Sequence, residues 1–250
     1  MGDSSAVAII PARIGSTRLE RKPLREVLGV PLVVRCMESV ARTGLFQDIV
    51  VATDALEVKD VVESHGGKAL LTDPGHPSGT DRVFEAASRM GLGHDAVVVN
   101  IQGDQPMVER SVLQALISFL EENEGTGMVT PVCPMTPEEA LNPNRVKVVV
   151  SGKGHALYFS RAPIPHPRDG DGRGRFFRHI GVYAYRYWFL RDFVMLPHGP
   201  LEGVERLEQL RALENEMRIG VVFVDSSPLD VDTEEDLREV EACLRKGLAP

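Results

Sequence analysis

A dense group of basic side chains directly follows the first apolar run of the chain. We expect Val7–Ile10 to form a buried strand. The stretch after it holds five basic residues and a single acid: Arg13, Arg18, Arg21, Lys22 and Arg25, with Glu20. The chain as a whole has a formal charge of −8, so this loop locally reverses the sign. Because α/β sheets bind phosphorylated ligands at the carboxyl ends of their strands, the loop predicts an anion site. A solvated basic turn is the alternative.

The small and charged residues of this loop suit a phosphate. Gly15 would let backbone N–H groups approach an anion, while Arg13 and Lys22 would bind phosphate oxygens from opposite sides. Neither standard phosphate fingerprint is present, since there is no GxxxxGK[ST] motif and Gly91-x-Gly93-x-x-Ala96 precedes its strand. The loop is therefore neither a P-loop nor a dinucleotide-binding turn.

Two aspartates further along the chain suit a metal site. Asp104 comes just after the apolar run 96–101, and Asp232 lies between the apolar run 219–224 and the last predicted helix. Magnesium prefers one or two carboxylates together with phosphate oxygens. Either aspartate also suits a turn or a helix cap. Two separate strand ends that carry aspartate favour a site for Mg²⁺ and a nucleotide.

Other polar residues have an ordinary structural alternative. Ser78 or Thr80 suits a helix cap as well as a ligand site. A lone histidine such as His179 is commonly structural, and Glu208 and Gln209 fit a solvated helix face. The sequence has no HExxH motif, His/Cys cluster or GxSxG elbow, which excludes metalloprotease and serine-hydrolase interpretations.

The hydrophobic pattern predicts an α/β scaffold with a mainly parallel, twisted sheet and helices on both faces. Strands are expected at 7–10, 48–52, 68–71, 96–101, 128–133 and 146–150. Helices are expected at 31–42, 55–65, 80–90 and 109–122. After Ser151 the alternation breaks down, which predicts a small mixed α+β lobe. Its expected parts are strands at 156–159 and 180–185, a Pro-, Gly- and Arg-rich excursion at 163–178, and a helix at 204–217. A strand at 219–224 and a helix at 233–245 close the chain.

Composition narrows the function classes. A chain of 250 residues can bury a sizeable core, and its negative charge argues against a nucleic-acid partner. The three cysteines, Cys36, Cys133 and Cys243, are far apart and predict reduced thiols, two of them in the core. The sequence shows neither a signal peptide nor an apolar run long enough to span a membrane. We therefore expect a cytoplasmic protein without membrane insertion.

Eight segments of the chain together resemble the CMP-Kdo synthetases, or 3-deoxy-manno-octulosonate (Kdo) cytidylyltransferases. They are IIPARIGSTRLERKPL from residue 9, VATD (51–54), SGTDR (78–82), VNIQGDQP (99–106), ALYFSRAPIP (156–165), HIGVYAYR (179–186), LEQLRALEN (207–215) and DVDTEED (230–236). Their order and spacing also agree. The resemblance implies a nucleotide-diphospho-sugar transferase fold and transfer of CMP from CTP to the anomeric hydroxyl of Kdo, for lipopolysaccharide synthesis.

The resemblance also assigns roles to residues. Arg13, Lys22 and Asp104 would carry catalysis, and Asp104 and Asp232 would bind Mg²⁺. The nucleotide would contact Pro11, Ala12, Arg13, Gly15, Ser16, Lys22, Ser78, Arg82 and Gln102. The sugar would contact Gln102, Arg161, His179, Tyr183, Tyr185, Glu208 and Gln209. The implied organisation is a single nucleotidyltransferase domain over 1–250, with an inserted sugar-binding and dimerisation lobe at about 152–218, in a homodimer.

The chain departs from the family pattern in two places. Glu20-Arg21 stands before Lys22 where the family commonly has Pro-Gly, and Gln105 follows Asp104 where it commonly has Glu. Gln105 is therefore given no role as a metal ligand.

Two alternatives stay open at this point. The first keeps the chemistry but uses 8-amino-Kdo or a sialic acid as acceptor. HIGVYAYR and LEQLRALEN favour Kdo over a sialic acid but do not exclude the amino sugar. The second alternative is a non-catalytic nucleotide-binding module. The joint presence of four charged residues argues against it: Arg13, Lys22, Asp104 and Asp232.

Overall fold

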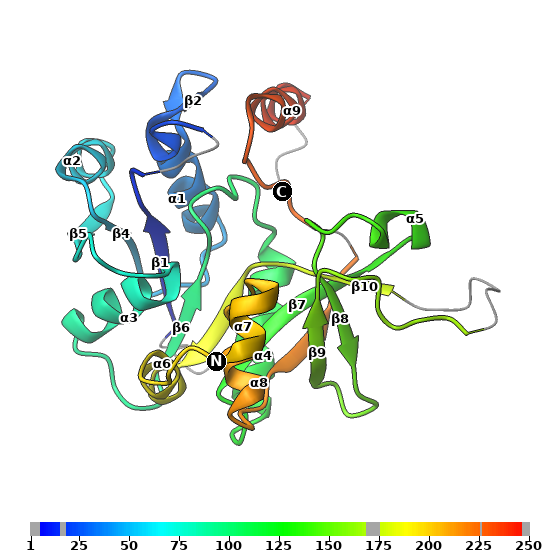
Figure 1. Ribbon diagram of the computed structural model, residues 1–250. Helices are drawn as coiled ribbons and strands as arrows, with labels where there is room; N and C mark the ends of the chain where they lie inside the picture. Colours follow the sequence, from blue (N-terminus) through cyan, green and yellow to red (C-terminus); the bar gives the residue numbers. More distant parts are fainter. Residues whose placement is uncertain (1–5, 16–18, 169–175, 226, 247–250) are drawn as a thin grey trace. The chain divides into compact units, whose positions relative to one another are not determined.

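The computed structural model describes residues 6–15, 19–168, 176–225 and 227–246 of the chain, which form two compact units (Figure 1). The first unit spans residues 1–114 and 228–250, and the second spans residues 115–227. Helix α4, Arg110–Glu122, runs from one unit into the other. This division falls at positions other than the expected lobe at about 152–218, and our interpretation as one domain with an inserted lobe stays a prediction.

The first unit contains a parallel sheet with the strand order β5-β4-β1-β6. The strands are β1 (Val7–Ala12), β4 (Asp48–Thr53), β5 (Lys68–Leu71) and β6 (Val97–Asn100). In the register of the sheet, β1 residue Val7 lies opposite both Asp48 and Val98. Side chains of β1 and β6 are almost entirely buried, as expected for strands covered on both faces.

Three helices connect these strands: α1 (Leu32–Arg42), α2 (Leu56–Ser64) and α3 (Gly79–Arg89). Helices α1 and α2 lead outward from β1 and contact each other, whereas α3 leads back across the sheet to β6. Right-handed crossovers therefore place α3 on the opposite face from α1 and α2. The expected strands and helices between residues 7 and 150 are confirmed, with ends that differ by at most two residues.

The C-terminal part of the chain returns to the first unit. Helix α9 (Glu234–Arg245) packs beside the 3₁₀ helix η1 (Lys22–Leu24) and the hairpin of β2 (Glu26–Val27) and β3 (Val30–Pro31). A buried apolar cluster joins them, in which Leu19 and Val27 meet Val231, Leu237 and Val240. This packing brings the end of the chain next to the basic loop. The sequence pattern did not reveal η1 or the hairpin.

The second unit is built around β7 (Met128–Met135). This strand pairs antiparallel with β10 (Phe176–His179) and β11 (Tyr183–Arg186), and parallel with β12 (Gly220–Phe223). Strand β8 (Lys147–Val150) pairs antiparallel with β10 and with β9 (Ala156–Ser160). The expected mixed or antiparallel element after Ser151 is confirmed. Two helices were not foreseen: α5 (Pro137–Ala140) and α6 (Tyr187–Val194).

The expected single helix at 204–217 is wrong. The chain instead forms α7 (Pro200–Glu205) and α8 (Leu210–Glu214), and between them Arg206 has a left-handed backbone with φ of 51°. Polar contacts from elsewhere explain the break. The Arg161 side chain donates hydrogen bonds to the carbonyl oxygens of Glu205 and Arg206, which an unbroken helix would use internally.

The expected strand at 180–185 is also wrong as one element. Strand β10 ends at His179 and β11 begins at Tyr183, because the Thr130 hydroxyl contacts the carbonyl oxygens of Ile180 and Val182. Of the excursion expected at 163–178, residues 176–178 belong to β10, and residues 169–175 lie outside the described part of the chain.

The remaining expectations concern cysteines and membrane spans. Cys36 on α1 and Cys133 on β7 are buried, as expected, and all three cysteines of the chain are free thiols. Burial raises the pKa of the Cys36 thiol well above its ordinary value. Within the described ranges, no helix combines the length and the apolar character that crossing a bilayer requires.

Candidate functional site

A pocket of about 350 Å³ lies at the carboxyl ends of β1 and β6 in the first unit. Its lining includes most of the residues predicted to bind the nucleotide or Mg²⁺: Pro11, Ala12, Arg13, Lys22, Ser78, Arg82, Gln102, Asp104 and Asp232. Gly15 does not line it, and Ser16 falls outside the described residues. Gly79 of the SGTDR segment also lines it, and sequence reasoning missed four further lining residues: Pro23, His76, Pro77 and Gly103.

Lys22 connects the two aspartates of the pocket. Its Nζ donates hydrogen bonds to Asp104 Oδ2 at 2.7 Å and to Asp232 Oδ1 at 2.9 Å. The Lys22 side chain is only 14% exposed. Burial would lower the pKa of Lys22, but attraction to Asp104 and Asp232 outweighs burial and raises it. The lysine is therefore a fixed cation, and two carboxylates separated by 128 residues of sequence converge on one point.

Backbone contacts explain how Asp104 and Asp232 come together. Gly103 lets the turn after β6 approach β1, since a Cβ at this position would lie 2.8 Å from the Pro11 carbonyl oxygen. The backbone N–H of Val231 then donates to the Asp104 carbonyl oxygen at 2.9 Å. Asp232 directly precedes Thr233, which caps α9 in a capping box with Asp236. The alternative role of a helix cap thus belongs to Thr233, and Asp232 is left to face the pocket.

Gln105 is a tether beside this pair of aspartates. It is 2% exposed, does not line the pocket, and its Nε2 donates to Asp230 Oδ1 at 2.7 Å. A glutamate here would set a second carboxylate against Asp230. The amide therefore suits this chain at the position where the family that it resembles commonly has Glu, and it holds the segment that carries Asp232.

The other basic residue of the pocket loop, Arg13, is exposed and makes no hydrogen bond or ion pair with any described residue. The next residue is anchored, because the Ile14 backbone N–H donates to Asp54 Oδ1 at 2.9 Å. Gly15 has no left-handed backbone, and a Cβ there would meet nothing within 4 Å. Arg13 is thus a pocket cation available to an anionic ligand.

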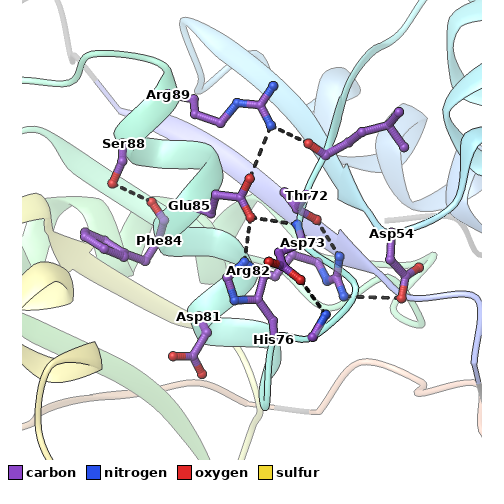
Figure 2. A network of polar contacts seen from close by, with 12 residues as sticks. Asp54, Thr72, Asp73, His76, Asp81, Arg82, Phe84, Glu85, Ser88 and Arg89 are labelled. Carbon is purple, nitrogen blue, oxygen red and sulfur yellow. Dashed lines mark hydrogen bonds and ion pairs between the residues drawn. The ribbon is translucent and has the colours of Figure 1, made fainter.

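Arg82 is connected to this loop through Asp54, and Figure 2 shows the contact between Arg82 and Asp54. Its guanidinium is 3% exposed, donates to the Thr72 hydroxyl, and forms an ion pair with Asp54 Oδ2 at 3.3 Å. Asp54 therefore joins Arg82 on one oxygen to the Ile14 backbone on the other. These contacts make Arg82 a positioning residue in the lining of the pocket.

His76 enters the pocket from the segment before α3, and Figure 2 shows it beside Glu85. Its Nε2 lies 2.6 Å from Glu85 Oε2, which also accepts from the Asp73 backbone N–H at 2.8 Å. Burial would raise the pKa of Glu85, but the hydrogen bonds from Asp73 and His76 lower it below its ordinary value. No motif pointed to His76, because a histidine in a loop lacks a sequence signature.

Ser78 acts as the N-cap of α3. Its Oγ accepts from the backbone N–H groups of Thr80 at 3.1 Å and Asp81 at 3.2 Å. The Ser78 hydroxyl therefore caps the helix, which is the structural role that the sequence offered as an alternative to ligand binding. Gln102 Nε2 donates to Asn100 Oδ1 at 3.3 Å. This contact holds the Gln102 side chain at the pocket wall.

The second unit contains a separate cluster of residues predicted to bind the sugar. The His179 ring lies 5.0 Å from the Phe159 ring and 5.3 Å from that of Tyr183, and the Tyr183 and Tyr185 rings stack at 5.8 Å. Burial, with a contribution from Arg178, lowers the pKa of His179 to about 3, so its imidazole is neutral at pH 7.

Glu208 and Gln209 lie in the turn between α7 and α8, not on a solvated helix face. Burial raises the pKa of the Tyr183 phenol well above its ordinary value, and the charges of Tyr185 and Glu208 add to this shift. The Glu208 carboxylate therefore belongs to the same neighbourhood as Tyr183. Gln209 is 4% exposed, and its buried Nε2 has no hydrogen-bond partner among the described residues. A buried amide donor without a protein partner suits a polar ligand that accepts a hydrogen bond.

Arg161 has a structural role in this unit. Its three guanidinium nitrogens donate to the carbonyl oxygens of Glu205, Pro143 and Arg206 at 2.7, 3.0 and 3.4 Å. The Glu205 carboxylate in turn accepts from the Ser160 hydroxyl at 2.5 Å and from the Arg161 backbone N–H at 2.9 Å. These bonds hold the corner between α7 and α8, and the sugar contact of Arg161 stays a prediction.

A family model described as cytidylyltransferase matches residues 7–219. The chain belongs to the cytidylyltransferase family. A relative from Desulfosudis oleivorans, named 3-deoxy-manno-octulosonate cytidylyltransferase, is 44% identical over 95% of this chain and 96% of its own length. A relative of the same name from Desulfatibacillum aliphaticivorans is 45% identical over 96% of this chain and 98% of its own length.

Solved structures agree with this membership. A CMP-2-keto-3-deoxy-manno-octonic acid synthetase in complex with CTP is similar to this cytidylyltransferase, with a TM-score of 0.92 and 36% identity. The similarity covers 98% of this chain and all of that one. A 4-diphosphocytidyl-2C-methyl-D-erythritol synthase from Anaerococcus prevotii shares the fold alone, with a TM-score of 0.62 and 16% identity. The expected nucleotide-diphospho-sugar transferase type of fold is confirmed.

Proposed function

We propose that this cytidylyltransferase transfers CMP from CTP to Kdo and releases pyrophosphate. One observation of the structure carries the proposal: Lys22, Asp104 and Asp232 converge in a pocket at the strand ends of a cytidylyltransferase fold. Arg13, which pairs with none of the described residues, lines the same pocket. The assignment of Kdo as the acceptor rests on relatives that match over nearly their full length and are named for that sugar acid and that reaction.

In the reaction, the anomeric hydroxyl oxygen of the sugar attacks the α-phosphorus of CTP. A new P–O bond forms, the bond to the bridging oxygen of pyrophosphate breaks, and the hydroxyl proton passes to solvent. Positioning and neutralisation of charge do most of the catalytic work in such a displacement. Arg13 and Lys22 bind the triphosphate, and the anchored backbone of Ile14 fixes the loop that carries Arg13. Lys22 must then exchange its bonds to aspartate for bonds to phosphate.

Asp104 and Asp232 fit a bound magnesium ion. Magnesium uses one or two protein carboxylates and takes its other ligands from phosphate oxygens and water. The two carboxylates converge on a single cationic nitrogen, Lys22 Nζ. A divalent ion would take the place of this nitrogen between them. Within the described residues, no group of three or more His, Cys, Asp or Glu side chains forms a ready-made metal site. When bound, Mg²⁺ would polarise the phosphoryl oxygens and neutralise their charge.

For the sugar, we propose the cluster of the second unit: His179, Tyr183, Tyr185, Glu208 and Gln209. The contact of Gln102, in the first unit, with the sugar stays a prediction. The unpaired buried amide of Gln209 supports this assignment, because a sugar hydroxyl would satisfy it. Arg161 is proposed to hold this cluster in shape through Glu205.

Pyrophosphate release tests the proposal. The protein is mixed with Mg²⁺ and CTP or UTP, and with Kdo, 8-amino-Kdo, a sialic acid or no acceptor. We expect release above background only with CTP and Kdo. Release with 8-amino-Kdo or a sialic acid instead would transfer the proposal to that acceptor. CTP binding without release for any acceptor would support the non-catalytic module.

A homodimer and a cytoplasmic location also stay predictions. The family resemblance supports the homodimer, and light scattering at micromolar concentration tests it. An expected mass of twice 27.4 kDa distinguishes the homodimer from a monomer.

A further inference from the structure

The hydroxyl of Thr130 contacts the His179 ring and bears on which ring nitrogen carries the proton. Thr130 lies in the middle of β7 and is fully buried, and its Oγ1 is 3.0 Å from His179 Nε2 on β10. The same Oγ1 lies 3.1 Å from the carbonyl oxygen of Ile180 and 2.9 Å from that of Val182. Three polar atoms therefore surround one hydroxyl.

Counting protons decides the direction of these hydrogen bonds. A threonine hydroxyl has one proton, and a carbonyl oxygen only accepts. The Ile180 carbonyl already accepts from the Val182 backbone N–H at 2.8 Å, whereas the nearer Val182 carbonyl depends on Thr130 among the bonds of the described chain. The Thr130 proton thus goes to Val182. A lone pair of Oγ1 is left for His179, so Nε2 must carry the proton and donate it.

We propose that Thr130 is a positioning residue that holds His179 as its Nε2–H tautomer, so that Nδ1 accepts a hydrogen bond from a hydroxyl of the acid sugar. This inference rests on the proposed function and deepens it. A bare Nδ1 attracts hydroxyl donors and repels the lone pairs of a carboxylate. His179 would thus select a hydroxyl, and the sugar carboxylate would bind elsewhere.

The opposite tautomer needs the Thr130 proton to point at Nε2. The buried Val182 carbonyl would then lose this donor, a loss that costs free energy without compensation. Nδ1 would carry the proton and would donate instead of accepting. The two tautomers therefore predict opposite preferences for ligand groups.

Nuclear magnetic resonance of ¹⁵N-histidine-labelled protein without any sugar tests the first part. Protonated and bare ring nitrogens have clearly separate ¹⁵N shifts, and the signals of His179 are those lost in H179Q. We expect a protonated Nε2 and a bare Nδ1 at pH 7, and a mixture of both tautomers in T130V. T130S should restore the single tautomer. The buried hydroxyl of Thr43, which bonds to Val40 in the first unit, offers T43V as a matched control that should leave His179 unchanged.

Steady-state kinetics test the second part. T130V should raise the KM for Kdo about tenfold, the effect of one hydrogen bond, while kcat changes less than about threefold. T130S should return the KM to within about twofold of the wild type. A protonated Nδ1 in the wild type would overturn the inference, and so would an unchanged KM in T130V. Because the resonance experiment needs neither CTP nor Kdo, a failure of the proposed function would leave its result intact.

Discussion

The two polar regions of this molecule are built on opposite electrostatic principles. The pocket of the first unit opposes full charges: Lys22 between Asp104 and Asp232, and Arg82 on Asp54. The cluster of the second unit is dominated by two half-buried rings that stay neutral: the pKa of His179 is lowered and the pKa of Tyr183 is raised. Triphosphate chemistry needs charges, whereas recognition of sugar hydroxyls needs neutral donors and acceptors with a fixed direction.

The largest expected effect comes from removing one charge of the first region. Asp104→Asn should lower kcat/KM by about 10²–10³, since it removes one of the two carboxylates that meet Lys22 in the described part of the chain. Pyrophosphate release measures the loss. Asp95→Asn, at an exposed position, is the matched control and should retain full activity. Near-normal turnover in Asp104→Asn would remove this residue from the catalytic site.

Lys22→Met tests whether the lysine and a metal ion compete for the same carboxylates. Without nucleotide, this variant should bind Mn²⁺ about tenfold more tightly than the wild type, because Lys22 no longer occupies Asp104 and Asp232. Calorimetric titration with Mn²⁺ measures this affinity. Arg21→Met removes a neighbouring charge that pairs with Glu57 alone among the described residues, and it should leave the affinity unchanged. Equal affinities in all three proteins would show that Lys22 does not block the metal.

The neutral state of His179 predicts a pH effect on stability. Below pH 6.5 the unfolded chain protonates this histidine, but the folded chain does not until about pH 3. The unfolded state thus binds more protons, and the free energy of unfolding falls as pH falls from 6.5 to 3. Arg178 reinforces this resistance to protonation, and the facing Tyr183 stays uncharged.

Urea unfolding at a series of pH values between 4 and 7 measures this slope. His179→Gln should reduce it by at most about 1.4 kcal/mol per pH unit, the limit for a single proton. His94→Gln, at an exposed position, should leave the slope unchanged. Identical slopes for the wild type and His179→Gln would mean that His179 titrates normally, and the contrast between the two regions would fail.

The smallest effect is expected for Arg21→Gly. Arg21 has a left-handed backbone with φ of 52°, which favours glycine, and its ion pair with Glu57 is exposed. The relief of backbone strain and the loss of the ion pair therefore nearly cancel. Thermal unfolding should show a change in the free energy of unfolding of about 1 kcal/mol or less. Activity should stay within about twofold of the wild type. A large loss of CTP binding would add Arg21 to the working cations of the pocket.

Much of the fold was predictable from local pattern. Strands β1, β4 and β6 are continuous apolar runs because both of their faces are buried, and the helices between them carry regular apolar stripes. The regions where prediction failed contain polar contacts between distant segments. Arg161 and Glu205 bend the chain between α7 and α8, and Thr130 separates β10 from β11.

By itself, the sequence determined which chemistry the first unit offers: cations in one loop and aspartates at two strand ends, all at positions that a parallel sheet brings together. Only the tertiary structure decided how these groups are used. It joined Lys22 to both aspartates, committed Arg82 and Arg161 to holding the backbone, and oriented His179 through Thr130. The reason is physical, since local periodicity encodes the burial of apolar faces, whereas the partner of a polar atom depends on segments far away in the chain.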